Sequence, residues 1–311
     1  MDFLVWLEGL RTPFLDSLFS LITLLGDEPV FTVMVLVLFW CVDKKKGYFL
    51  LYVGLLGTIV NQWLKMLCCV PRPWLRRQGF TIVESARAAA TGYSFPSGHT
   101  QNITVIGLSI ACFLRRWGGR IACIVVILLV GLSRMYLGVH TPADVLVSLL
   151  AGTALTLGLY PLFQKHGQNP RFFVLMFTAL LGFSLLFVLY AELAPFPANA
   201  VTEFSEQGVK QAYTMLGTVA GLLAVYLFER RFVRFDERAV LWVQLLKAAL
   251  GLALVVAIRS GLKAPLLALT GGHNAAHAIR YFLMFFVGGG LWPMTFRFLP
   301  RAARARAGAE G

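Results

Sequence analysis

Residues 65–144 contain several charged and histidine side chains among long apolar segments. These side chains, with one serine and one glycine that lie among them, are Lys65, Arg72, Ser97, Gly98, His99, Arg134, His140 and Asp144. Ionisable side chains in apolar surroundings are costly unless they serve a site. Three cations, two histidines and one carboxylate can hold an oxyanion and supply a nucleophile and a proton. The set predicts an oxyanion pocket with a nucleophile.

The anion predicted for this pocket is a phosphoryl group. Ser97 and Gly98 immediately precede an apolar segment. Free backbone amides at the start of a helix favour an anion, and a glycine permits close approach of the backbone. Arg72 and Arg134 are suited to bidentate contact with phosphoryl oxygens, and Lys65 adds a third charge. Phosphoryl transfer depends mainly on positioning and on neutralised charge, so we expect chemistry without a metal or other cofactor.

The two histidines divide the covalent work. A neutral imidazole can attack phosphorus, while an imidazolium can protonate the departing alkoxide. Asp144 lies four residues after His140, one helical turn away, where it can hold the ring tautomer. We therefore predict His140 as the nucleophile and His99 as the general acid. In the second half-reaction His99 would be the base that activates water.

Each of these residues also has a purely structural interpretation. Asp144 follows Thr141 and Pro142 in the pattern of a helix N-cap, and Ser97 can mark a helix start in the same way. Lys65 and Arg134 can be snorkelling cations at the ends of membrane segments. The structural interpretation would need all these charges to fall into one pattern by chance.

Three sequence blocks carry a resemblance to a known family. Residues 65–73 fit K-x6-R-P, residues 96–99 are PSGH, and residues 133–144 fit S-R-x5-H-x3-D. With these blocks in order, the chain resembles the type 2 phosphatidic acid phosphatase and haloperoxidase superfamily, in its membrane lipid phosphatase branch. The resemblance covers roughly residues 29–165 and leaves the last third of the chain unexplained.

The resemblance implies a role for each residue of the three blocks. The fold it implies is a helical bundle in which His140 is the nucleophile, His99 is the acid and Asp144 pairs with the nucleophilic histidine. The residues it implies for holding the phosphate are Lys65, Arg72, Ser97, Gly98 and Arg134.

The amino-acid composition indicates that the site lies in a membrane protein. Of 311 residues, 58% are hydrophobic and 14% are charged, far more apolar than a soluble domain. Several stretches reach the ~20 apolar residues that cross a hydrocarbon core as a helix. We expect an all-α, polytopic transmembrane helix bundle with a six-helix phosphatase-type core and an extra C-terminal helical region.

The expected organisation has three parts. Residues 1–28 read as an interfacial amphipathic segment, 29–191 as the membrane phosphatase core, and 192–311 as additional transmembrane helices with a basic tail. Membrane crossings are expected near 29–42, 47–70, 99–114, 120–138, 143–163, 171–191, 210–228, 239–258 and 279–298.

The formal net charge of +13 is a topology signal rather than a nucleic-acid patch, because the cations lie in short loops between apolar segments. Lys44, Lys45 and Lys46 place one end of the bundle in the cytoplasm. Counting crossings from there puts Arg72 and His140 together on the extracytoplasmic face of the cell membrane. The expected partners are the membrane and a lipid phosphate, not nucleic acid.

The C-terminal third offers weaker signals. Gln244 and Lys247 lie within an apolar run, where a functional role is worth considering. His273 and His277 have the spacing of two metal ligands on a helix, but no third ligand lies nearby in the sequence. We therefore interpret them as solvated histidines of a loop. An alternative is that these histidines, with Lys263 and Arg280, contact a second phosphate or a head group.

The predicted function is metal-independent hydrolysis of a lipid phosphate monoester or diphosphate through a phosphohistidine. Phosphatidic acid, polyprenyl diphosphates and sphingoid-base phosphates all fit. Two other classes stay open. A lipid phosphotransferase would pass the phosphoryl group to another lipid, and a non-catalytic lipid carrier would not need the histidine pair. The sequence leaves the lipid and the oligomeric state open.

Overall fold

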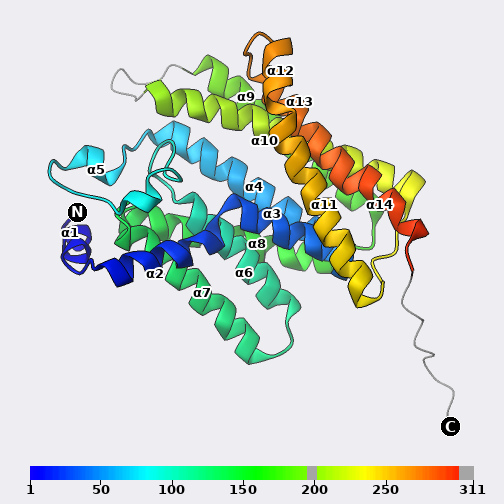
Figure 1. Cartoon of the computed structure of the whole chain (residues 1–311), viewed down its shortest axis with the longest axis horizontal. Helices are drawn as coiled ribbons and strands as arrows, with labels where there is room; N and C mark the ends of the chain where they lie inside the picture. Colours follow the sequence, from blue (N-terminus) through cyan, green and yellow to red (C-terminus); the bar gives the residue numbers. More distant parts are fainter. Residues whose placement is uncertain (195–201, 301–311) are drawn as a thin grey trace.

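The computed structural model describes residues 1–194 and 202–300, and within these ranges the chain is helical without a β-strand (Figure 1). Six of the described helices are long and apolar enough to cross a membrane. A seventh crossing is possible if the bent pair Pro13–Gly26 and Glu28–Val42, which turns by 48°, is counted as one. The prediction of an all-α, polytopic helix bundle is confirmed.

The helices follow one another along the chain with short connections, apart from the loop after α4. The α-helices are α1 (Asp2–Gly9), α2 (Pro13–Thr23), α3 (Glu28–Val37), α4 (Lys44–Cys68), α5 (Pro73–Arg76), α6 (Gly98–Phe113), α7 (Trp117–Tyr136), α8 (Pro142–His166), α9 (Pro170–Leu193), α10 (Thr202–Phe228), α11 (Leu241–Gly261), α12 (Lys263–Leu269), α13 (Ala275–Phe286) and α14 (Trp292–Met294). The π-helical turns η2 (Leu38–Val42), η4 (Glu229–Val233) and η5 (Val287–Leu291) extend α3, α10 and α13. Short 3-10 turns are η1 (Leu24–Gly26), η3 (Glu84–Ala86) and η6 (Thr295–Phe298).

Helix α4 lies in the middle of the bundle. Helices α6, α8, α9 and α10 all pack against it, and its side chains from Tyr48 to Val53 are buried. A helix that is apolar on all sides needs such surroundings. Tyr48 packs on Phe173 and Phe177 of α9 and on Tyr226 of α10, with ring centroids 5.2–6.0 Å apart. This aromatic cluster joins the N-terminal and C-terminal halves of the chain.

The C-terminal helices attach to the bundle through α10, which makes its most extensive contact with α13. Gly217 and Gly221 lie one turn apart on α10 and allow this approach. A Cβ at Gly217 would lie 2.0 Å from the carbonyl oxygen of Ala278, and one at Gly221 would lie 2.8 Å from the Cβ of Phe285. Small residues at this spacing let two membrane helices pack backbone to backbone. Helix α13 is therefore held beside the central helices.

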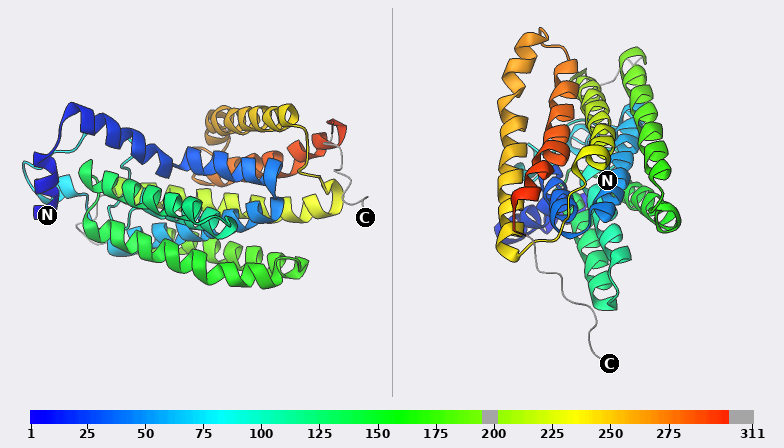
Figure 2. Two further views of the ribbon diagram at one scale, coloured as in Figure 1. Left: turned by 90° about the horizontal axis from the view of Figure 1, so that it is seen from below. Right: turned by 90° about the vertical axis from the view of Figure 1, so that its right-hand side faces the viewer.

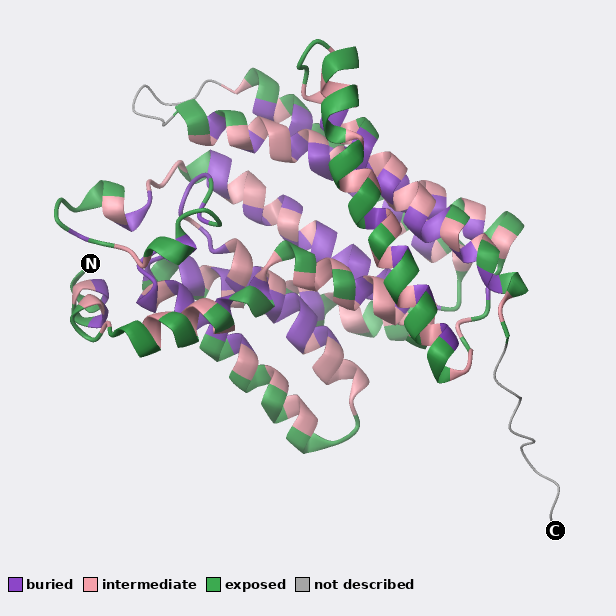
Figure 3. Ribbon diagram, viewed as in Figure 1, coloured by how far each residue is buried: buried purple, intermediate pink, exposed green. Residues whose placement is uncertain are grey.

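The peripheral helices carry many exposed residues on their outer sides (Figure 3), and large apolar side chains are among them. Leu128 on α7, Leu150 on α8, Leu175 on α9 and Leu245 on α11 are each more than half exposed. A surface this apolar is suited to contact with lipid chains rather than water.

The two ends of the bundle differ in character. The axes of the long helices are roughly aligned, with α1 at one end of the bundle and α14 at the other (Figure 2). Helix α4 begins with three consecutive lysines, and Lys65 lies 21 residues further on, about 30 Å away at 1.5 Å per residue. The loop of residues 69–97 and the α7–α8 connection lie at the Lys65 end. Backbone hydrogen bonds join them, from Val83 N to the carbonyl of Leu137, at 3.1 Å.

Candidate active site

The starts of α6 and α8 meet at the Lys65 end of the bundle. Ser97 caps α6 and its Oγ accepts a hydrogen bond from Thr100 N, while its own amide donates to the carbonyl of Asp144 at 3.1 Å. Thr141 caps α8 in a capping box with Asp144, and Pro142 occupies the first helical position. Two helix N-termini, each with its positive end, are thus fixed side by side.

His140 lies in the tight connection between α7 and α8 and is 2% exposed. Its Nδ1 is 3.4 Å from Oδ2 of Asp144, and its Nε2 is 3.0 Å from Nη1 of Arg72. Burial and the neighbouring Arg72 guanidinium hold the pKa of the His140 imidazole well below its ordinary value. The ring is therefore neutral near pH 7, as a nucleophile must be.

Asp144 has two functions at once. Its Oδ2 accepts hydrogen bonds from Thr141 N at 2.8 Å and from Ser94 Oγ at 2.6 Å, besides facing His140. The cap and the histidine partner, which the sequence offered as separate interpretations, are the same carboxylate. Ser94 was not predicted, because a serine inside a long loop carries no positional signal.

Arg72 connects the loop of residues 69–97 to the α7–α8 connection. Its guanidinium donates to the carbonyls of Gly92 at 2.9 Å, Thr91 at 2.7 Å and Val139 at 3.1 Å. Lys65 donates from Nζ to the carbonyl of Tyr93 in the same loop. Both cations are thus anchored by neutral oxygens, and among the described residues neither forms a direct ion pair with a carboxylate, so both can bind an anion.

Arg134 is fully buried at the end of α7 and only partly hydrogen-bonded. Its Nη1 donates to Oγ1 of Thr23 at 2.7 Å, whereas Nε and Nη2 have no acceptor in the described part of the chain. A buried donor without a partner costs about 1–3 kcal/mol. An oxyanion would supply the missing acceptors, as predicted for a phosphate-binding arginine.

His99 has a partner that sequence reasoning missed. Its Nε2 contacts Oδ1 of Asp27, which lies at the bend between α2 and α3. Gly26 at this bend also lies against His99, since a Cβ at Gly26 would be 2.8 Å from the carbonyl oxygen of His99. Each candidate catalytic histidine therefore has its own carboxylate.

A cavity of about 210 Å³ brings these residues together. Of the predicted site residues, Lys65, Arg72, Gly98, His99 and His140 line it, whereas Ser97, Arg134 and Asp144 do not belong to its lining.

Part of the cavity lining comes from helices that the motifs do not cover. It consists of Gln211, Met215 and Thr218 of α10 and Tyr281, Met284 and Phe285 of α13. The C-terminal helices therefore form one side of the candidate site.

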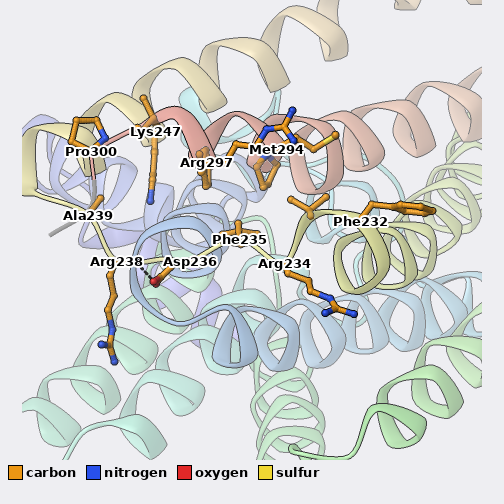
Figure 4. A pocket seen from close by; sticks show the side chains of 14 residues that line it. Phe232, Arg234, Phe235, Asp236, Arg238, Ala239, Lys247, Met294, Arg297 and Pro300 are labelled. Carbon is orange, nitrogen blue, oxygen red and sulfur yellow. Dashed lines mark hydrogen bonds between the residues drawn. The ribbon is translucent and has the colours of Figure 1, made fainter. Parts of the chain in front are cut away.

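The other C-terminal candidates lie elsewhere or have a structural explanation. Lys247 is 1% exposed and points from α11 toward the segment of Asp236 and Arg238, beside a small cavity of about 70 Å³ (Figure 4). Its ammonium donates to the carbonyl of Glu237 at 3.2 Å and lies 4.6 Å from the ring centre of Phe296. Lys44 contacts the same segment, so this cavity is at the end of α4 far from Lys65.

The prediction of two solvated loop histidines is wrong for one of them. His273 is exposed, but His277 lies inside α13 and is only 5% exposed, because that face of α13 packs toward α10. Among residues 1–194 and 202–300, no group of three or more His, Cys, Asp or Glu side chains is arranged to hold a metal ion.

Comparisons with known proteins agree with the three blocks. Residues 46–168 match the PAP2 superfamily, and residues 213–304 match the transmembrane extension of PAP2 superfamily phosphatases. No solved structure matches the chain.

Three curated proteins are similar to parts of the chain. The putative undecaprenyl-diphosphatase YbjG of Escherichia coli is 33% identical over 98 residues, 32% of this chain and 47% of that protein. The undecaprenyl-diphosphatase BcrC of Bacillus subtilis is 31% identical over 121 residues, 39% and 58% respectively. Lipid phosphate phosphatase delta of Arabidopsis thaliana is 26% identical over 228 residues, 64% and 53% respectively. The chain thus spans about half the length of the relatives it matches.

Proposed function

Because the chain belongs to the PAP2 superfamily of phosphatases, we propose that it is a multi-pass membrane enzyme that hydrolyses a lipid phosphate through a phosphohistidine. The observation that carries this proposal is the position of His140 and His99, which line one cavity with Lys65 and Arg72. One ring nitrogen of each histidine faces a carboxylate, and the other ring nitrogen does not.

In the first half-reaction, His140 attacks phosphorus. Asp144 faces Nδ1, so the lone pair of Nε2 forms the new nitrogen–phosphorus bond. The bond from phosphorus to the lipid oxygen breaks, and His99 gives its proton to that oxygen. Asp27 faces Nε2 of His99, which leaves Nδ1 as the nitrogen that donates the proton.

In the second half-reaction, His99 takes a proton from water. The water oxygen bonds to phosphorus, the nitrogen–phosphorus bond of the phosphohistidine breaks, and inorganic phosphate leaves. Lys65, Arg72 and Arg134 neutralise the charge on the phosphoryl oxygens in both steps, together with the backbone amides at the start of α6. The buried N–H groups of Arg134 without acceptors support this assignment.

Asp27 is expected to position His99, and replacing it with asparagine should lower kcat by about 10- to 100-fold. The carboxylate stabilises the imidazolium that donates the proton, whereas an amide of the same size does not. The measurement is phosphate release from a lipid phosphate by the purified variant. Asp16→Asn serves as a control, because Asp16 is also on the N-terminal segment but accepts a hydrogen bond from Tyr136. Equal rates for both variants would remove Asp27 from the mechanism.

We also propose that the site faces the extracytoplasmic side of the cell membrane. Lys44, Lys45 and Lys46 begin α4, and Arg116 and Arg120 lie at the α6–α7 connection, both at the end far from Lys65. The positive-inside rule places that end in the cytoplasm.

Polyprenyl diphosphates are the substrate class that we propose first. The cavity lining combines the cations Lys65 and Arg72 with apolar side chains such as Phe31, Met215 and Phe285. This combination is suited to a phosphate joined to a hydrocarbon chain. Two of the similar proteins are named undecaprenyl-diphosphatases, which supports a diphosphate.

The test is phosphate release by the purified protein in detergent with EDTA. The panel contains a polyprenyl diphosphate, phosphatidic acid and a sphingoid-base phosphate, with a lipid alcohol added as acceptor. We expect free phosphate from at least one substrate and the highest kcat/KM for the diphosphate. Transfer of phosphate to the added alcohol without free phosphate would indicate a phosphotransferase. No reaction with any substrate by a folded protein would indicate a carrier.

A further inference from the structure

A second group of cationic and histidine side chains lies on the C-terminal helices, outside the lining of the cavity. It consists of Lys210 of α10, Lys263 at the start of α12, and His277 and Arg280 of α13. His277 and Arg280 are 5% and 7% exposed, whereas Lys210 is half-buried and Lys263 is exposed. Arg280, Lys210 and Lys263 all act electrostatically on His277. Four residues from three helices therefore share one positive region.

Among the described residues, the cations of this region have no direct carboxylate partner. In the parts of the chain that the structure describes, Lys210, Lys263 and Arg280 form no ion pair with Asp or Glu. Arg280 has weak partners, the carbonyl of Arg259 at 3.4 Å and Nδ1 of His277 at 3.2 Å, and its Nε has no acceptor among residues 1–194 and 202–300. A buried guanidinium without an anion is strongly unfavourable. An anionic ligand would offset this cost.

The cluster continues the wall of the cavity. His277, Arg280, Tyr281 and Met284 have the spacing of one helix face, and all four are buried. Tyr281 and Met284 line the cavity, so His277 and Arg280 lie one turn nearer the start of α13 on the same face. On α10, Gln211 follows Lys210 directly and lines the cavity as well.

Contacts also connect the cluster to the leaving-group side of the site. Asp27 faces His99, and the next residue, Glu28, pairs with Arg259 at 3.5 Å. The carbonyl of Arg259 in turn accepts a hydrogen bond from Arg280. His99 protonates the departing oxygen in the proposed mechanism, so these contacts connect the cluster to the histidine that serves the leaving group.

We propose that Lys210, Lys263, His277 and Arg280 form a second anion site for the phosphate that stays on the lipid when the substrate is a diphosphate. This inference rests on the proposed function. The terminal phosphoryl group goes to His140, the bond from its phosphorus to the bridging oxygen breaks, and the lipid monophosphate leaves with its charge held by the second site. The enzyme would then prefer diphosphates to monophosphates of the same chain.

The test compares farnesyl diphosphate with farnesyl monophosphate in a non-ionic detergent. The variants are Arg280→Gln and, because a buried arginine can matter for folding, the double variant Lys210→Gln/Lys263→Gln. We expect the ratio of the two kcat/KM values, diphosphate over monophosphate, to fall by about 10- to 100-fold for Arg280→Gln. The double variant should lower the ratio by about 10-fold.

Arg87→Gln is the matched control, since Arg87 is an exposed arginine of the loop of residues 69–97 that pairs with Glu84. Its ratio should equal that of the wild type. An unchanged ratio in both test variants would overturn the proposal. It would also be overturned if the variants differed from the wild type only after phosphatidylglycerol is added, because the site would then bind a neighbouring lipid head group.

A binding measurement separates this inference from the proposed function. In the His140→Ala background, affinities for farnesyl methylenediphosphonate and farnesyl phosphonate are measured by calorimetry. Adding Arg280→Gln should weaken only the diphosphonate, by about 10-fold or more. Equal weakening of both ligands, or of neither, would overturn the second site. This result is decisive even if the wild type hydrolyses no lipid phosphate.

Discussion

Replacing His140 with alanine is expected to lower kcat for lipid phosphate hydrolysis by at least about 10⁴-fold, because the step that it removes is formation of the phosphoenzyme. The other basic side chains of the cavity lining that the structure describes have different contacts from His140. His99 contacts Asp27, and Lys65 and Arg72 donate hydrogen bonds to backbone carbonyls. The alanine variant keeps the phosphate-binding groups and should still bind substrate.

The measurement is a rapid quench with substrate labelled at the terminal phosphorus. The wild type should show an acid-labile, base-stable label on the protein, and His140→Ala should show none. His166→Ala is the matched control, since His166 ends α8 at the opposite end of the helix and packs near Phe172. Activity above about 1% in a folded His140→Ala protein would mean that another group attacks phosphorus.

Sequence spacing was sufficient to predict which residues of the candidate site lie close together, because local structure holds them. His140 and Asp144 are one helical turn apart, and Ser97 and Gly98 begin a helix. Such relations follow from helix geometry and need no tertiary information. The order of the three blocks then brought Lys65 to the same end, since each crossing reverses the direction of the chain.

Contacts between distant segments could not be read in this way. Asp27 reaches His99 through the bend between α2 and α3, and neither residue has a spacing that relates it to the other. The wall formed by α10 and α13 depends on the close approach at Gly217, which only the folded chain reveals. His277 was placed in solvent because its local sequence is polar, whereas the helix buries that face.

Lys247 shows the converse, since its position in an apolar run suggested a function but its contacts explain its burial. The backbone carbonyl of Glu237 and the ring of Phe296 satisfy its ammonium about 30 Å from the candidate site. Arg280 is also buried, but its Nε lacks a comparable acceptor among the described residues. Unsatisfied donors, rather than burial alone, distinguish a binding site from a structural cation.

Replacing His99 with alanine is expected to lower kcat for a lipid phosphate monoester by about 10²- to 10⁴-fold, because an alkoxide is a poor leaving group without a proton. With p-nitrophenyl phosphate, whose leaving group needs no proton, the first step should survive. The second step also uses His99, as the base that activates water, so turnover should still be slow. The variant should therefore release a burst of p-nitrophenol equal to the enzyme concentration and accumulate the phosphoenzyme.

The burst distinguishes a general acid–base from a residue that merely supports the fold. A structural defect would slow the burst and the steady state together, for both substrates. Asp27→Asn supplies the internal comparison, since it keeps the imidazole but removes the carboxylate that faces Nε2. It should show the same pattern with a smaller fall in rate. If His99→Ala shows no burst and no phosphoenzyme, while its unfolding temperature equals that of the wild type, His99 acts before phosphoryl transfer, and the division of labour between the two histidines is wrong.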